Sequence, residues 1–495
     1  MLFKNINESF SKNEKKFFLE KVNIINELIK KYCKKNNINY EAISIKNDLV
    51  LTELISIGIL DNQEDLPILK KTTKIEYEPL LKSLTFYSKN KKETNYLLKK
   101  FYNSYRKKKQ DERLDSNKPK IIDLFCGAGG FSWGFVREGY QIELSNDIEP
   151  CAIETYKYNH PDVESNKILD GDIKEIVNHI EDHVKTDIDV IIGGPPCQSF
   201  SSANQQRVID DPRNILYKYY VKAVEKVRPK FILMENVRGM SKVADQVVDD
   251  FKKIDYTVKY KLYDSSDFSV AQKRVRLIYV GISKEYVKEK SITPELLMQD
   301  IEAELKNQKK YVLKDALEHI KPLICPKIKN QTEIDCEESG KKIDLNDYKN
   351  KSNEYIKLIN NNNEFDFVFN HKARYQNENN QKIYETLSQG RDSTCDSISD
   401  IMPYSHRNHV FKDKYFKLVA NVPCRTITAH MKMDCHSHIH PTQVRSLTPR
   451  EAARIQSFPD DYLFMGAYLK TYMQIGNAVP PLMSKVFAKV YRQYL

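Results

Sequence analysis

The chain has 495 residues, more than one ordinary hydrophobic core organises, so two or three folding units are expected. Hydrophobic residues make up 40% and charged residues 30%, which excludes a globally disordered or collagen-like chain. No run of about 18 apolar residues occurs, and the N-terminus lacks the apolar segment of a signal peptide. We therefore expect a cytoplasmic protein without a membrane span.

Positive charge is concentrated at the start of the chain. The sequence holds 79 Lys and Arg against 68 Asp and Glu, a net charge of +11, and residues 1–118 supply 25 of the basic and 16 of the acidic residues. The extension thus carries +9 of the +11. This favours a polyanionic partner, although a solvated lysine-rich surface is the commoner explanation. The nine cysteines form no CxxC pair, which indicates unpaired thiols in a reducing compartment.

The predicted elements fall into regions that follow one another along the chain. Residues 1–100 show helical periodicity, and the charged stretch 106–119 is typical of a linker, so residues 1–118 form a mostly helical extension. From Lys120 onward, short apolar runs alternate with helical patterns. The predicted strands are residues 121–125, 188–192, 231–234 and 277–280. This alternation predicts a doubly wound α/β domain whose site lies at the carboxyl ends of the strands.

Residues 283–440 lose this alternation and are rich in Asn, Lys and Asp. They are predicted to form a smaller inserted domain with many loops. Apolar periodicity returns after Arg445 and continues to the C-terminus, so residues 441–495 should rejoin the α/β domain of residues 119–282.

A glycine-rich turn follows the first predicted strand, in the segment Asp123-Leu-Phe-Cys-Gly-Ala-Gly-Gly-Phe131. Glycine allows a ligand to approach the backbone, and the following helix N-terminus offers amide donors to an anionic group. About twenty residues later Asp147 could hold ribose hydroxyls, and another acid, Asp172, follows Asp170-Gly171. Taken alone, the turn could equally be structural.

Polar segments also follow the later strands. Cys197 stands after two glycines and two prolines, where a rigid loop could present a nucleophilic thiol. Glu235 begins Glu-Asn-Val at the end of another strand, and an ion pair there is the plain structural alternative. Arg274 and Arg276 alternate in Gln-Lys-Arg-Val-Arg, so both could face one ligand.

Together these segments resemble the C5-cytosine DNA methyltransferase family in order and spacing. The family has a DxFxGxGG loop, a PCQ loop, an ENV segment and a QxRxR segment; RxLTxREAxRxQxFP and GNAV follow a variable region. This chain has each of them, the last two beginning at Arg445 and Gly476. The resemblance spans residues 119–495, and it implies a Rossmann-like catalytic domain with an inserted target-recognition domain.

The resemblance implies a covalent mechanism. Cys197 would add to C6 of the target cytosine, because C5 is otherwise too poor a nucleophile to accept a methyl group. Glu235 would protonate or hydrogen-bond N3, and Asn236 would help to orient the loop. One of the paired arginines, Arg274 or Arg276, would polarise the O2 side of the base. The methyl donor would be S-adenosyl-L-methionine (AdoMet), with S-adenosyl-L-homocysteine as product.

The resemblance also implies which residues bind the cofactor. Phe125 and Ile148 would lie against the adenine, Asp147 would hold the ribose, and Asn477 belongs to a last motif that folds back beside the first. The full implied set is Phe125, Gly127, Gly129, Gly130, Asp147, Ile148, Asp172, Ile173, Leu216 and Asn477. No metal is expected, since the His and Cys residues between His430 and His440 fit no common zinc spacing.

The substrate implied is double-stranded DNA, from which the target base must be flipped out. Residues 283–440 would read the sequence. The expected setting is a monomer near the nucleoid in a bacterial restriction-modification system, in which a cognate restriction endonuclease would act separately. Two alternatives stay open: a tRNA cytosine methyltransferase of the same fold, and a non-catalytic DNA-binding regulator. The Cys-Phe-Thr signature of the tRNA branch is absent, and the intact Cys197 and Glu235 argue against the regulator.

Overall fold

Seven strands form the central sheet of the computed structural model, which describes residues 2–3, 6, 9–102, 118–196, 216–329, 333–403 and 414–495. The strand order is β3-β2-β1-β4-β5-β7-β6, with β7 antiparallel to both neighbours. The strands are β1 (Lys120–Leu124), β2 (Gln141–Asp147), β3 (Ile168–Asp170), β4 (Val190–Gly193), β5 (Phe231–Val237), β6 (Tyr256–Asp264) and β7 (Val275–Ser283). The first five run parallel and end at one edge of the sheet, which confirms the predicted α/β class.

Helices cover both faces of this sheet because successive strand residues point to opposite sides. Ile121 and Ile192 join one hydrophobic cluster, whereas Ile122 and Ile191 join another. The helices over the first face are α7 (Gly130–Arg137), α14 (Pro294–Lys306) and α20 (Pro481–Arg492), with α8 (Pro150–Asn159) beside them. Those over the second are α9 (Ile173–Asn178), α10 (Ile180–His183), α11 (Leu216–Val227) and α12 (Ala244–Lys253).

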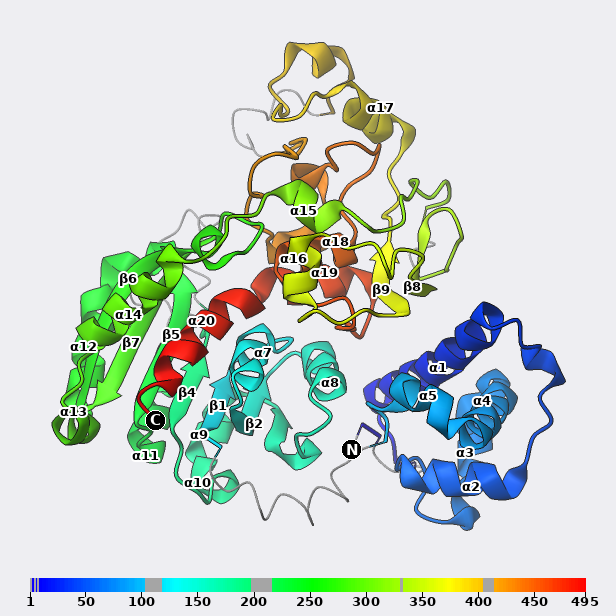
Figure 1. Cartoon of the computed structure of the whole chain (residues 1–495), viewed down its shortest axis with the longest axis horizontal. Helices are drawn as coiled ribbons and strands as arrows, with labels where there is room; N and C mark the ends of the chain where they lie inside the picture. The colour runs from blue at the N-terminus through cyan, green and yellow to red at the C-terminus, as the bar shows by residue number, and fades with distance from the viewer. Residues whose placement is uncertain are drawn as a thin grey trace.

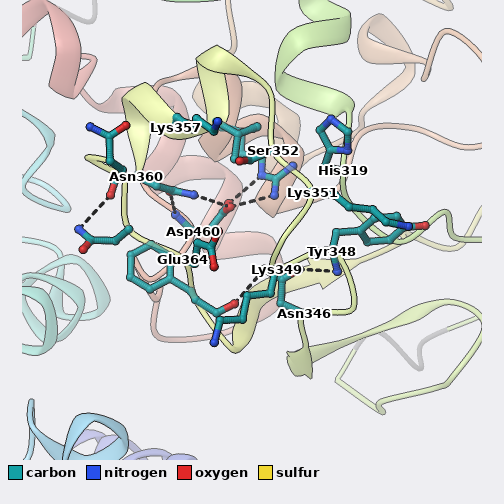
Figure 2. Close-up of a pocket in the computed structure, with 15 residues that line it drawn as sticks. His319, Asn346, Tyr348, Lys349, Lys351, Ser352, Lys357, Asn360, Glu364 and Asp460 are labelled. Atoms are coloured by element: carbon teal, nitrogen blue, oxygen red, sulfur yellow. Dashed lines mark hydrogen bonds and ion pairs between the residues drawn. The ribbon is translucent and has the colours of Figure 1, made fainter.

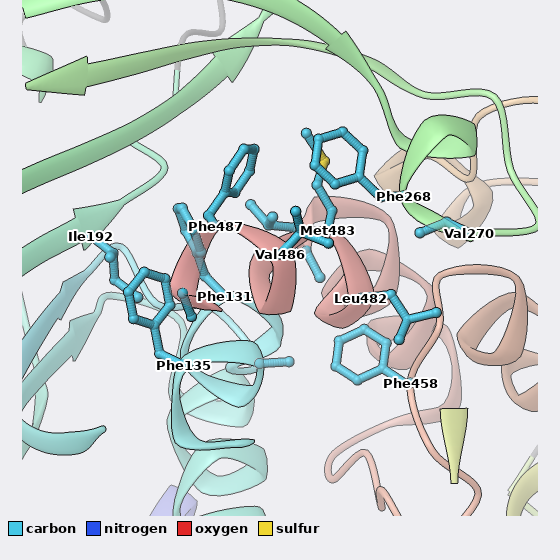
Figure 3. Packing of buried hydrophobic residues seen from close by; sticks show 14 of the residues in the cluster. Phe131, Phe135, Ile192, Phe268, Val270, Phe458, Leu482, Met483, Val486 and Phe487 are labelled. Atoms are coloured by element: carbon cyan, nitrogen blue, oxygen red, sulfur yellow. The ribbon is translucent and has the colours of Figure 1, made fainter. Parts of the chain in front are cut away.

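The last helix of the chain completes the first core. Phe487 of α20 packs with Phe135 of α7 and Ile192 of β4, and Figure 3 shows these side chains meeting between the helices and the sheet. Helices α13 (Lys284–Lys290) and α14 also pack against β7. The last helix of the chain, α20, therefore lies within the α/β unit.

The inserted segment contains a strand pair, β8 (Gly340–Leu345) with β9 (Phe367–Lys372), in antiparallel register. Its helices are α15 (Leu313–Leu317), α16 (Glu354–Ile359) and α17 (Glu378–Thr386), and the C-terminal α18 (Pro449–Ile455) and α19 (Tyr468–Asn477) pack beneath it. In Figure 1 this part, yellow to orange, lies beyond one end of the α/β unit.

Three buried arginines fasten the insert to the C-terminal segment. Arg445, Arg450 and Arg454 are at most 1% exposed. Each donates to a backbone carbonyl of the insert: Arg445 to Leu323, Arg450 to Phe369 and Arg454 to Glu318, at 3.2, 2.7 and 2.9 Å. A buried guanidinium without partners costs several kcal/mol. Moving the insert away would break these bonds, so they hold the insert against the C-terminal segment.

The N-terminal extension is helical, as predicted: α1 (Lys12–Lys35), α2 (Asn47–Ser56), α3 (Leu66–Thr73), α4 (Tyr77–Lys89) and α5 (Lys91–Leu98). Ser11 and Glu14 form a capping box that starts α1. Figure 1 shows the extension, in blue, beside α8 and the β8–β9 pair. Within the described part of the chain, no helix is both long and apolar enough to span a membrane.

Candidate active site

The glycine-rich loop leaves β1 through three residues with positive φ. Phe125, Gly127 and Gly129 have φ of 59°, 52° and 87°, and Gly129 is the N-cap of α7. A Cβ on Gly129 would lie 2.9 Å from Tyr156 and from His160, so this glycine is required by packing. A Cβ on Gly127 would meet nothing within 4 Å. The open side of Gly127 leaves room for a ligand directly against the backbone.

Asp147 holds this loop in place from the end of β2. Its Oδ2 accepts a hydrogen bond from the Gly127 amide, and its Oδ1 accepts one from Glu149, both at 2.8 Å. Burial raises the pKa of Asp147 above its usual value, although these amide donors favour the carboxylate. The next residue, Ile148, is 68% exposed. An acid and an uncovered apolar side chain therefore stand together at the carboxyl edge of the sheet.

The remaining predicted cofactor residues divide into two groups. Ile173 is 4% exposed within the second hydrophobic cluster, against which Phe125 and Leu216 pack with partly exposed side chains. Asp172 caps α9 by accepting from the Lys174 amide at 2.9 Å. Phe125, Ile173 and Leu216 thus pack in one apolar cluster, whereas Asp172 is the N-cap of α9.

The last motif folds back onto the first. A Cβ on Gly130 would lie 2.4 Å from the Val479 carbonyl oxygen, so the segment after α19 packs directly on the glycine-rich loop. Asn477 ends α19 with an exposed side chain. More than 340 residues separate Gly130 from Val479 in the sequence, and only tertiary packing brings them side by side.

The polar pair at the end of β5 is the second half of the site. Arg276 Nε lies 2.8 Å from Glu235 Oε1, and Glu235 is 9% exposed. A Cβ on Gly194 would be 3.3 Å from Glu235 Oε2, so the second carboxylate oxygen faces the Gly-Pro-Pro segment. Asn236 Nδ2 donates to the Pro195 carbonyl at 3.0 Å. Cys197 lies just outside the described residues, two positions after this anchored proline.

Arg274 and Arg276 have different environments. Arg274 is 2% exposed, and its terminal nitrogens donate to the carbonyls of Ile427 and Gly476 at 2.9 and 3.0 Å. Burial and the neighbouring Arg276 lower the pKa of Arg274. The structure therefore places Arg276 on Glu235 and uses Arg274 to tie the insert and α19 to β7.

Two glutamines of the motifs, to which sequence reasoning gave no role, support the same junction. Gln272 Nε2 donates to Gln456 Oε1 at 2.8 Å, and Gln272 Oε1 accepts from the Ile427 amide at 2.7 Å. Gln456 in turn donates to the Ile475 carbonyl at 2.8 Å. Both glutamines are fully buried. The sequence could have pointed to them, because Gln272 and Gln456 are the glutamines that the QxRxR and RxLTxREAxRxQxFP motifs specify.

Beneath the glycine-rich loop lies a buried polar network. Ser132 Oγ donates to Asp123, and the Tyr156 hydroxyl bonds both Ser132 and Ser145, at 2.6 and 2.7 Å. Desolvation raises the pKa of Asp123 to about 7. The network links β1, β2, α7 and α8, the elements that carry the loop.

A separate pocket of about 250 Å³ lies between the insert and the C-terminal segment (Figure 2). Asn360 and Asp460 hydrogen-bond at its wall, and Lys349, Lys351 and Lys357 also line it. None of its lining residues belongs to the predicted site. Among the described residues, no group of three or more His, Cys, Asp or Glu could hold a metal ion.

Known proteins share this architecture. The family model for C-5 cytosine-specific DNA methylase matches residues 119–492. Type II methyltransferase M1.HphI of Haemophilus parahaemolyticus is 31% identical over 380 residues, covering 74% of this chain and 85% of the relative. A solved structure, described as a DNA modification methyltransferase encoded within an E. coli prophage, superposes with a TM-score of 0.56 at 24% identity, covering 76% and 99% of the two chains; this supports the fold.

One relative also matches the extension. Type II methyltransferase M.Sau96I of Staphylococcus aureus is 28% identical over 466 residues, covering 92% of this chain and 90% of the relative. Residues 119–495 are only 377 of the 495, so this match includes part of residues 1–118.

The fold, the family-model match and the similarity to a known methyltransferase define a DNA cytosine methyltransferase. The chain belongs to the C-5 cytosine-specific DNA methylase family, with a helical extension that precedes the family's own residues.

Proposed function

We propose that this enzyme transfers a methyl group from AdoMet to C5 of a flipped-out cytosine in a specific duplex DNA sequence. The observation that carries the proposal is the Glu235–Arg276 pair, 2.8 Å apart and beside the Gly194–Pro196 segment that leads into Cys197. The structure thus brings an acid and a guanidinium to the segment that the chain follows toward Cys197, and covalent activation of a pyrimidine needs a nucleophile beside such a pair.

The residues near the glycine-rich loop fit the proposed cofactor. The uncovered backbone of Gly127 suits the methionine part, Asp147 suits the ribose hydroxyls, and the exposed Ile148 suits an adenine face. Phe125 and Leu216 would add apolar contacts from the neighbouring cluster. AdoMet, when bound, supplies an electrophilic methyl group.

The proposed roles of the catalytic side chains follow from their chemistry. The Cys197 thiolate adds to C6, and the electron density displaced by this addition makes C5 nucleophilic. Glu235 gives or shares a proton at N3, which limits the charge that builds up on the ring, and Arg276 holds the Glu235 carboxyl in place. After methylation, loss of the C5 proton and elimination of Cys197 restore the aromatic ring and release the product.

The substrate and setting are part of the same proposal. The relatives' names describe Type II methyltransferases, and we assign this chain to the same restriction-modification role, with a separately acting endonuclease as partner. Residues 283–440, fastened by the buried arginines, would read the DNA sequence. Base flipping costs a few kcal/mol of unstacking, which contacts in the site must offset.

The purified chain tests this proposal directly. Incubated with labelled AdoMet, it should methylate mixed-sequence duplex DNA and leave tRNA unlabelled. In DNA from a host expressing the chain, bisulfite treatment should leave cytosine unconverted at one recognition sequence. The cytosines that flank this sequence should be fully converted. Labelled tRNA would support the alternative substrate, and the absence of transfer to any duplex would overturn the enzyme assignment.

A further inference from the structure

Neighbouring residues of helix α1 connect the N-terminal extension to the α/β unit and to the insert. Glu20 of α1 accepts a hydrogen bond from the Gly466 amide at 2.8 Å and forms an ion pair with Lys342 of β8. The next residue, Lys21, pairs with Glu154 of α8 and is 6% exposed. Helix α1 therefore joins three parts that lie far apart in the sequence: α8, β8 and the loop before α19.

Apolar packing makes this contact part of the folded core. The hydrophobic cluster of the extension includes Tyr158 of α8, Phe367 and Phe369 of β9, and Leu463 and Met465 of the C-terminal segment. All are at most 7% exposed. Removing the extension would expose this apolar patch, which a stable fold does not leave uncovered.

Charge also favours docking within the molecule. Lys35 pairs with Asp366 next to β9, and Lys100 donates to the Asp461 carbonyl at 3.0 Å. With Lys21, these lysines of the basic extension meet carboxylates or carbonyls of the rest of the chain. Part of the extension's positive charge thus serves an internal interface, and that part is not free for a nucleic acid.

A continuous series of contacts leads from Glu20 to the glycine-rich loop. A Cβ on Gly466 would lie 2.8 Å from Cys151 Cβ, so the loop held by Glu20 packs on the start of α8. The Cys151 thiol donates to Glu149 Oε1 at 3.3 Å. The Glu149 amide donates to Asp147, which accepts from Gly127, each at 2.8 Å.

We infer that Glu20 is a positioning residue of the cofactor site. By fixing Gly466 against Cys151, it holds the start of α8, and with it Asp147 and the Gly127 amide, in the geometry that binds the ligand. The inference rests on the proposed AdoMet site. It gives residues 1–102 a role inside the enzyme, in addition to any contact with DNA.

Three substitutions in the full-length chain test this role. Glu20→Ala removes the acceptor for Gly466, and AdoMet should bind about 3- to 10-fold more weakly, the size of coupling that residues distant from a ligand produce. Glu20→Gln keeps an oxygen acceptor and should retain most of the affinity. Glu27→Ala is the matched control and should match the wild type, because this partly exposed side chain of α1 forms ion pairs with Lys30 and Lys31 of the same helix.

Two measurements separate positioning from general stability. Calorimetric titration with AdoMet gives the dissociation constant, and hydrogen exchange on the protein without ligand reports the amides of residues 147–152. Glu20→Ala should speed exchange there while the amides of α12, on the far face of the sheet, exchange as in the wild type. If Glu20→Ala does not fold, Glu20→Asp, which shortens the side chain by one methylene, takes its place with the same expectation.

The outcomes are distinct. Unchanged AdoMet affinity and unchanged exchange at residues 147–152 in both Glu20→Ala and Glu20→Asp would overturn the inference. An equal loss of affinity in Glu27→Ala would do so as well, because the effect would then belong to the whole helix. A wild-type chain that binds no AdoMet would instead overturn the proposed function.

Discussion

Arg276 Nε and Glu235 Oε1 are 2.8 Å apart at the carboxyl edge of the sheet, and both side chains are at most 15% exposed. A partly buried carboxylate that is paired on one oxygen keeps the other free for a base. Here the other oxygen faces Gly194, on the approach to Cys197. This geometry is the basis for the proposed contact between Glu235 and the base.

Replacing Glu235 should slow methyl transfer and leave AdoMet binding unchanged. Glu235→Gln keeps the shape but cannot supply a proton, so kcat for methyl transfer should fall by about 10²- to 10⁴-fold. Arg276→Lys keeps the charge but loses the Nε donor and should give a smaller loss. AdoMet affinity should be unchanged in both. Glu225→Gln, an exposed carboxylate on α11, is the control; equal activity of Glu235→Gln and wild type would exclude the assigned role.

Cys197 should form a covalent bond to the base. A duplex with 5-fluorocytosine at the target should trap the enzyme, because the fluorine cannot leave as a proton does and elimination of the thiol is blocked. The adduct should survive denaturing electrophoresis and be absent in Cys197→Ala, which should still bind AdoMet. Cys336→Ala, at a partly exposed thiol of the insert, should trap normally. Trapping by Cys197→Ala would point to a different nucleophile.

His371 should make the fold sensitive to mild acid. Its ring bonds Thr448 Oγ1 at 3.1 Å and the Lys321 carbonyl at 2.7 Å, joining the insert to α18. Desolvation lowers its pKa to about 4, with Glu451 opposing and Arg445 reinforcing the shift. The native state therefore binds fewer protons than the unfolded state, so stability is lost as pH falls from about 6.5 to 4.

The matching experiment is urea unfolding at several pH values. His371→Asn should flatten the loss between pH 6.5 and 4, by at most about 1.4 kcal/mol per pH unit. His179→Asn, at a largely exposed histidine, should follow the wild type. The same slope in His371→Asn and wild type would show that the acid sensitivity comes from other groups.

The buried pair Arg454–Asp460 should be costly to break from one side. Arg454 Nε bonds Asp460 Oδ1 at 2.7 Å, and both are at most 2% exposed. Asp460→Asn leaves an uncompensated guanidinium and should lower the free energy of unfolding by about 3 to 5 kcal/mol. Arg454→Met with Asp460→Leu removes both charges and should recover much of it. The measurement is the denaturation midpoint, and the exposed pair Lys309–Glu354 is the control. If the stability losses of the two single substitutions simply added up in the double variant, the two residues would not be coupled.

The sequence by itself determined much of the local structure and the family. Short apolar runs between helical patterns predicted β1, β4, β5 and β7, and helical periodicity predicted the extension. The expectation of a parallel sheet was wrong for β7, which runs antiparallel to both of its neighbours. The family motifs identified Glu235 and the glycine-rich loop, and the comparisons confirm the family. The catalytic and cofactor roles of individual residues, and the domain boundaries, stay predictions. Strands β2, β3 and β6 were not singled out: β3 has three residues, and β6 alternates lysines with apolar residues at the edge of the sheet.

Only the tertiary structure decided how distant side chains pair. The alternating arginines look equivalent in the sequence, yet Arg276 meets Glu235 whereas Arg274 bonds carbonyls more than 150 residues away. Likewise, nothing local in α1 shows that Glu20 meets Gly466, 446 residues later. Periodicity and spacing encode which way a side chain points from its own element, whereas its partner depends on how the elements pack, and packing joins residues without regard to their separation in the chain.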